Sequence, residues 1–141
     1  MDEESRRKRR VALRWAAIVP VALVLWYATL ALAMALNALL LRFCPQTSLL
    51  GDYCTADWSR PAERAIAVCC AGLAALLVVL GSAYVAPAYR LRVALLLFVI
   101  GVGVSVSMIG QLAAVPEFVA VVLGGLLGVL VARTLPGEVV V

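Results

Sequence analysis

The sequence predicts an all-α integral membrane protein, a bundle of four transmembrane helices with both termini in the cytoplasm. Three observations support this fold class. Of the 141 residues, 65% are hydrophobic and 14% are charged, and the mean hydropathy of +1.08 lies outside the range of soluble domains. The apolar residues form four long runs. The lysine and arginine residues gather at alternate ends of these runs.

The first predicted span covers residues 15–41, between Arg14 and Arg42. A helix needs about 20 apolar residues to cross a hydrocarbon layer about 30 Å thick, and helices satisfy every backbone polar group in lipid. Pro20 falls near the start of this span, where proline disturbs a helix least. Because the apolar run continues to Leu41, we expect an uncleaved span rather than a signal peptide.

The second predicted span covers residues 65–89, and the third covers residues 93–114. Pro61 and Glu63 precede the second span, and both residue types are favoured in the first turn of a helix. Arg92 directly precedes the third span. Both runs are long enough to cross the bilayer as helices.

The fourth predicted span covers residues 118–132 and is short, at about 15 residues. Val115, Pro116 and Glu117 interrupt the apolar sequence before it. Three outcomes are compatible with this length: the helix extends back through the interruption, it thins the bilayer locally, or it packs on neighbouring helices rather than on lipid.

The positive-inside rule predicts the orientation of the spans. On one side lies the loop of residues 43–64 with its flanking Arg42, and this side carries 3 of the 12 cations together with several carboxylates. The other 9 lie on the side of both termini: Arg6, Arg7, Lys8, Arg9, Arg10, Arg14, Arg90, Arg92 and Arg133. Both termini are therefore predicted to be cytoplasmic, with the loop outside the plasma (inner) membrane.

The chain divides on this basis into a basic cytoplasmic tail (1–13), a four-helix transmembrane domain (14–134) and a short C-terminal extension (135–141). The tail is attracted to anionic lipid by about 1 kcal/mol per cation near the surface. It lacks the aromatic or structured support of a nucleic-acid site, so we expect no nucleic-acid partner. The bias toward Ala, Val, Leu and Arg, without histidine, is typical of a GC-rich bacterial genome.

The outer loop carries Cys44 and Cys54. Turn-forming residues between them, among them Pro45 and Gly51, are expected to fold this strip back on itself. Because the predicted topology places the loop in an oxidising compartment, we expect a Cys44–Cys54 disulfide that stabilises by about 2–3 kcal/mol. A redox-active pair is the alternative, although the spacing is wider than in a C-x-x-C motif.

Cys69 and Cys70 are adjacent within the second predicted span, and their side chains point about 100° apart on a helix. The simplest interpretation is two small apolar side chains packed between helices. The alternative is a soft-metal site, since thiolates select ions such as Cu(I). A vicinal pair in a membrane helix, with a second pair in a loop, resembles the arrangement in bacterial mercuric ion transporters, which would imply metal transport. This chain departs from that arrangement in its outer loop pair and in having no proline after Cys70.

The polar content of the spans is low. No Asp, Glu, Lys or Arg falls in the middle of a span, and the chain contains no histidine. These features disfavour proton-coupled transport and exclude His-ligated haem and His-containing zinc sites. Asn37 and Gln111 lie toward the outer ends of the first and third spans, where we expect an amide hydrogen bond between helices worth about 0.6–2 kcal/mol. A substrate path lined by these amides is the alternative.

Small residues on the last two spans predict close helix packing, because they let backbones approach. We expect the third and fourth helices to form a tight hairpin, with a glycine face left free for another subunit as the alternative. The second span contains fewer small residues of this kind, at Gly72 and Gly81. The predicted packing residues are Gly101, Gly103, Ser105, Ser107, Gly124, Gly125 and Gly128.

From these features we expect a small polytopic membrane protein that is not an enzyme and acts as an accessory or assembly subunit. Its expected partners are the lipid bilayer and another membrane protein or a second copy of itself, with no cofactor and no metal. One alternative is a small transporter or channel, with Cys69 and Cys70 handling a soft metal. The other is a thiol–disulfide membrane enzyme that uses Cys44 and Cys54.

Overall fold

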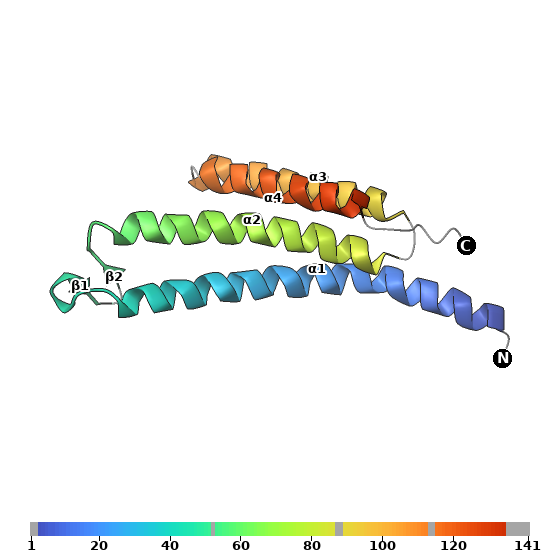
Figure 1. The fold of residues 1–141 in the computed structure, drawn as a ribbon, viewed down its shortest axis with the longest axis horizontal. Coiled ribbons are helices and arrows are strands. Elements are labelled where there is room, and N and C mark those ends of the chain that lie inside the picture. The colour runs from blue at the N-terminus through green and yellow to red at the C-terminus, as the bar shows by residue number, and fades with distance from the viewer. Residues whose placement is uncertain (1–2, 52, 87–88, 113–114, 135–141) are drawn as a thin grey trace.

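The computed structural model describes residues 3–51, 53–86, 89–112 and 115–134 (Figure 1). Within these ranges the chain is helical apart from one short hairpin, and each of the 4 helices is long and apolar enough to span a membrane. The predicted all-α class with four candidate spans is confirmed to this extent. The elements in chain order are α1 (Glu3–Arg42), the 3-10 turn η1 (Gln46–Ser48), β1 (Leu49–Leu50), β2 (Tyr53–Cys54), α2 (Ser59–Val85), α3 (Arg90–Leu112) and α4 (Val115–Thr134).

Helix α1 is 40 residues long and includes most of the basic segment predicted as a separate tail. Arginine, lysine and glutamate favour helix almost as much as alanine, so the helix continues past the apolar run to Glu3. This corrects the expectation for Pro20, which lies inside the helix and not near its start. Figure 1 shows α1 curved, with its N-terminal turns diverging from α2. An interior proline removes one backbone hydrogen bond and is a usual cause of such bending.

Helix α2 lies at the centre of the arrangement. It packs against α1 on one side and against α3 and α4 on the other, and α3 also packs against α4. In Figure 1, α2 and α4 run in one direction while α1 and α3 run in the other. We call the end at which α1 begins and α4 ends the terminal end, and the end with β1 and β2 the hairpin end.

Helix α4 begins at Val115 and is 20 residues long. Of the three outcomes considered for the short fourth span, extension back through the interruption is the one observed. Pro116 is the second residue of the helix, where its missing N–H has no intrahelical role. At the other junction α2 ends at Val85, and Tyr89 precedes α3 with a positive φ of 55°.

The buried core is small and lies between α2, α3 and α4. Its fully buried members are mostly alanine and valine, with Leu80 and Phe98 packed against them. Large apolar side chains elsewhere are exposed over most of the helix surface, including Val19, Met34 and Leu123. A water-soluble fold would bury such side chains, whereas helices in lipid associate by close packing and leave them facing the acyl chains. The core residues are Val79, Ala83, Ala94, Val129 and Ala132.

Candidate functional site

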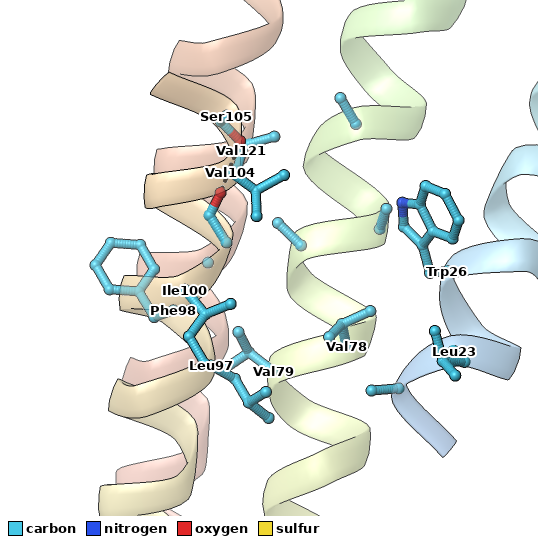
Figure 2. Close-up of a pocket in the computed structure, with 16 residues that line it drawn as sticks. Leu23, Trp26, Val78, Val79, Leu97, Phe98, Ile100, Val104, Ser105 and Val121 are labelled. Atoms are coloured by element: carbon cyan, nitrogen blue, oxygen red, sulfur yellow. Dashed lines mark hydrogen bonds between the residues drawn. The ribbon is translucent and has the colours of Figure 1, made fainter. Parts of the chain in front are cut away.

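An apolar groove runs along α2 between α1 and α3 and has a volume of about 450 Å³ (Figure 2). It exists because α1 packs on α2 and makes at most marginal contact with α3 in the described residues. The floor is a row of small side chains on α2, at Ala71, Ala74 and Ala75, followed by Val78. Because alanine side chains are short, the surface of α2 is recessed here, and larger side chains on the flanking helices form the walls.

The two walls differ in character. On α1, Leu23 and Trp26 point toward α2, and the Trp26 ring contacts the neighbouring Tyr27 ring edge-on at 5.0 Å between centroids (Figure 2). On α3, Ile100 and Val104 provide the wall. All four of these wall side chains are half exposed or nearly so, although each is large and apolar. The groove is therefore open along its length to whatever surrounds the helices.

Ser105 is a polar side chain in this lining, and its hydroxyl is already used. Its Oγ donates to the carbonyl oxygen of Gly101, one turn earlier on α3, at 2.8 Å. A serine bonded to its own helix presents mainly its methylene group to the surroundings. The groove can consequently hold an apolar chain by shape and contact, and its lining is not that of a site for a polar substrate.

The glycines of α4 lie close to α2. A Cβ added to Gly124 would overlap the carbonyl oxygen of Gly72 on α2, and one added to Gly72 would lie 3.1 Å from the carbonyl oxygen of Ala120. One turn further, a Cβ on Gly128 would lie 3.1 Å from Val79 Cβ. The backbones of α2 and α4 approach so closely only because neither helix carries a side chain at the crossing.

Gly125 packs in a different way, against α3. A Cβ added there would lie 2.5 Å from the Phe98 ring, which fills the space above the glycine. The contact between α3 and α4 therefore includes an aromatic ring on α3 packed over a glycine on α4, beside the core residues Ala94, Val129 and Ala132. Gly81 of α2 similarly faces the end of the Leu25 side chain on α1.

The small residues of α3 lie in more open surroundings than those of α4. A Cβ on Gly101 or on Gly103 would meet no atom within 4 Å among the described residues. The Ser107 hydroxyl donates to the Val104 carbonyl oxygen of its own helix at 2.6 Å, as Ser105 does to Gly101. Gly101 lines the groove, across which α1 lies. Gly103 is exposed, and no described helix lies opposite it.

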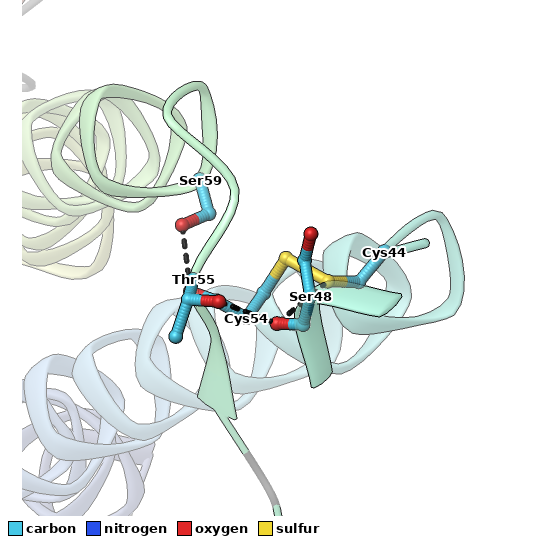
Figure 3. The surroundings of a disulfide bond; sticks show 5 residues. All are labelled: Cys44, Ser48, Cys54, Thr55 and Ser59. Carbon is cyan, nitrogen blue, oxygen red and sulfur yellow. Dashed lines mark hydrogen bonds between the residues drawn. A yellow bond between two sulfur atoms is a disulfide. The ribbon is translucent and has the colours of Figure 1, made fainter. Parts of the chain in front are cut away.

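The loop between α1 and α2 contains the predicted disulfide, between Cys44 and Cys54 (Figure 3). The strip between them folds back as an antiparallel pair, with Leu49 opposite Cys54 and Leu50 opposite Tyr53. Gly51 has a φ of +60° in the connecting turn, a conformation that glycine adopts at little cost. Covalent closure and strand pairing together fix the conformation of this hairpin.

Hydrogen bonds tie the strands of the loop together and join the loop to the start of α2. The buried Ser59 Oγ donates to the Cys54 carbonyl oxygen at 2.8 Å, at the first residue of α2 (Figure 3). The Thr55 backbone N–H and hydroxyl both donate to the Ser48 carbonyl oxygen, at 2.9 and 2.8 Å. These bonds hold the hairpin in a fixed position relative to the start of α2.

Three large apolar side chains are exposed on this loop, which the sequence did not lead us to expect. Phe43 and Leu50 are each 71% exposed and Tyr53 is 77% exposed. The apolar residues that flank the turn are visible in the sequence. Which of them are exposed depends on the pairing register of the two strands. A rigid loop with an apolar surface is typical of a contact surface for protein or for the lipid interface.

Cys69 and Cys70 are both free thiols in different surroundings. Cys69 is exposed on the helix surface, whereas Cys70 is buried. Within the described residues, no group of three or more His, Cys, Asp or Glu side chains lies close enough to hold a metal ion. The buried position of Cys70 fits a small packing side chain, and no described contact favours a two-thiolate metal site.

The Asn37 amide donates to the Ala33 carbonyl oxygen of its own helix at 3.0 Å. Its predicted partner, Gln111, has a side chain outside the part that the structure describes. Thr29 behaves like Asn37, with its buried hydroxyl bonded to the backbone of α1 at Trp26, 2.8 Å away. On α1, then, these two polar groups are satisfied locally rather than across helices.

Fold and site together define a class: an all-helical protein with four helices suited to a membrane, a stapled hairpin and an apolar groove. Comparison with protein-family models, with curated proteins and with solved structures gave no match. The function is therefore argued from the geometry alone.

Proposed function

We propose that this chain is a small accessory or assembly subunit of the plasma membrane, without catalysis of its own, which contacts a partner membrane protein through the stapled hairpin. The termini are cytoplasmic and the hairpin is outside. The distribution of cations supports this orientation, since the terminal end carries three times as many as the hairpin end. A persistent disulfide at the hairpin end agrees with an oxidising outer compartment.

The observation that carries the proposal is the surface of the hairpin. Three large apolar side chains, Phe43, Leu50 and Tyr53, are each more than 70% exposed on a loop held by a disulfide and by a hydrogen bond from Ser59 of α2. A fixed surface loses little conformational entropy on binding, so it favours contact with a partner of matching shape. Aromatic side chains are also enriched at the centres of protein interfaces.

The free face of α3 supports the same function within the membrane. Gly103 and Ser107 are exposed, and no described residue packs against Gly103. Small residues at this spacing allow another helix to approach closely. The hairpin and this face together offer contact outside and inside the bilayer.

Site-specific photocrosslinking tests the proposal in native membranes. A photoreactive amino acid replaces Tyr53 in the full-length chain, and the adducts are resolved by mass. We expect one protein adduct of defined mass, whose yield falls strongly with Leu50→Ser and is unchanged with Thr47→Ala, a matched exposed position of the same loop. Tagging the captured protein should recover this chain in return.

A second probe position makes the result specific. Leu123 is exposed on α4 in the membrane-spanning part, and a photoreactive residue there should react mainly with lipid. If the Tyr53 position yields only lipid adducts, or if its protein adduct persists unchanged with Leu50→Ser, the accessory-subunit proposal is wrong.

A further inference from the structure

The groove between α1 and α3 is too short for a transmembrane helix. Its floor runs from Ala71 to Val79 on α2, and its α3 wall runs from Leu97 to Ser105. At 1.5 Å per residue each of these stretches is about 12 Å long, against the roughly 30 Å that a spanning helix occupies. A single flexible apolar chain fits such a groove better than a helix does.

The groove lies toward one end of the molecule. Ala71 is near the middle of α2, and Val79 is close to its C-terminal turns, which lie at the terminal end. Likewise Leu23 and Trp26 lie in the half of the candidate span Val11–Arg42 that is nearer the N-terminus. On α1 and α2 the groove therefore extends from the middle of the spans into the terminal half, the half occupied by one leaflet of a bilayer. On α3 it is centred on Gly101, the middle of the helix.

The charge at that end is positive. Arginines from three helices gather there and outnumber Glu3 and Glu4 of α1, whereas Asp57, Glu63 and Glu117 lie at the hairpin end. Anionic lipid headgroups are attracted to such clusters of cations. The arginines with described side chains are Arg6, Arg9, Arg14, Arg90, Arg92 and Arg133.

Arg90 connects this charge to the groove. It is the first residue of α3, and it precedes Leu97 by seven residues and Gly101 by eleven. These separations are about two and three helical turns, so Arg90 lies on the helix face that forms the groove wall. The rise from Arg90 to Leu97 is about 10 Å along the helix axis, a distance that the glycerol and first methylenes of a phospholipid can cover.

We propose that the groove binds one acyl chain of an anionic phospholipid whose phosphate lies against Arg90. The alanine floor and the Trp26 and Ile100 walls surround the methylene chain, and the headgroup remains at the terminal end. This site is separate from the hairpin surface and does not depend on a partner protein.

Trp26 provides a direct reporter of the occupant, because it lines the groove. The full-length chain with Trp15→Phe and Trp58→Phe, both at exposed positions, has Trp26 as its single tryptophan. It is reconstituted in phosphatidylcholine vesicles that contain increasing fractions of brominated phosphatidylglycerol or of brominated phosphatidylcholine. We expect Trp26 fluorescence to be half-quenched at an about fivefold lower fraction of the anionic lipid, the ratio for one arginine near an anionic headgroup.

Two variants distinguish binding of the acyl chain in the groove from binding of the headgroup at Arg90. Gly101→Leu projects a side chain into the groove, where no described atom lies within 4 Å of an added Cβ. It should reduce quenching by both lipids, whereas Gly103→Leu, on the same helix but outside the groove lining, should not. Arg90→Gln should abolish the preference for the anionic lipid, whereas Arg64→Gln, at the hairpin end, should leave it unchanged. Unchanged helicity by circular dichroism controls for folding.

Equal quenching by the two lipids would overturn the proposal, because it would show general contact with the bilayer. Quenching by neither lipid would also overturn it, since a second copy or another helix would then fill the groove. Native mass spectrometry of the chain with all three tryptophans gives an independent readout. We expect one retained anionic phospholipid per chain, lost with Gly101→Leu, and a chain that retains none would contradict the assignment.

Discussion

The glycines of α4 and those of α3 have the same chemistry, yet they lie in opposite environments. Gly124 faces the Gly72 backbone at the α2–α4 crossing, where an added Cβ would overlap the Gly72 carbonyl. Gly101 and Gly103 face open space in the same part of the structure. A glycine therefore permits close helix packing, but packing occurs only where another helix lies opposite it.

The difference lies in what stands opposite each glycine. At the α2–α4 crossing both helices lack a side chain, so backbone meets backbone. At Gly125 the partner is the Phe98 ring, and at Gly81 it is the flexible end of Leu25. A series of identical Gly→Ala changes therefore tests the comparison with the intrinsic helix propensity held constant, because each change adds the same methyl group to a helix interior.

Gly124→Ala should have the largest effect. The added methyl would overlap a backbone carbonyl of α2, which moves only if the two helices separate. We expect a loss of about 2–3 kcal/mol in the free energy of unfolding, the upper part of the range for overpacking. The measurement is unfolding in mixed micelles with increasing SDS, followed by far-ultraviolet circular dichroism. A stability equal to wild type would show that the α2–α4 crossing is looser than described.

Gly125→Ala should cost less, about 1–2 kcal/mol, because its neighbour is a ring and not a backbone. The Phe98 side chain can rotate away at the cost of some packing. Combining Gly125→Ala with Phe98→Leu should recover part of the loss, and the coupling between the two changes measures the contact. Simple additivity of the two effects would mean that Phe98 does not cover Gly125.

Gly81→Ala should be close to neutral, within about 0.5 kcal/mol of wild type. The overlapping atom is the terminal methyl Cδ1 of Leu25, at the end of a flexible side chain. A small rotamer adjustment on α1 relieves the contact, and the gain in helix propensity offsets it. The same SDS titration measures it, and a loss as large as that of Gly124→Ala would show that α1 is held as tightly on α2 as α4 is.

Much of this architecture follows from the sequence, and the rest depends on relations between distant segments. The four spans were predictable because hydropathy is a local property, and so was the Cys44–Cys54 bridge, since the turn residues between the cysteines bring them together. Which glycines pack was not predictable, because spacing identifies a small face but not the face opposite it. The groove was missed for the same reason: it requires α1 and α3 to stay apart across the alanines of α2.

Helix boundaries show a second limit. The fourth span is too short when it is counted from Phe118, and the structure starts the helix at Val115 because Pro116 is compatible with a first turn. Pro20 is the opposite case, since it lies inside α1 when the sequence suggested a position near its start. Proline therefore marks a helix start only where the residues before it do not form a helical turn. That condition holds for Pro116 but not for Pro20.

Gly103→Ala should have the smallest effect and the opposite sign. Within the described residues nothing opposes an added Cβ at this position, so the substitution introduces no overlap. Replacing glycine by alanine in a helix interior stabilises by up to about 1 kcal/mol through backbone entropy. The purified chain should therefore unfold at an equal or higher SDS fraction than wild type. If this variant is instead destabilised in purified form, Gly103 packs against a second copy of the chain in the micelle, and dilution should then reduce the loss.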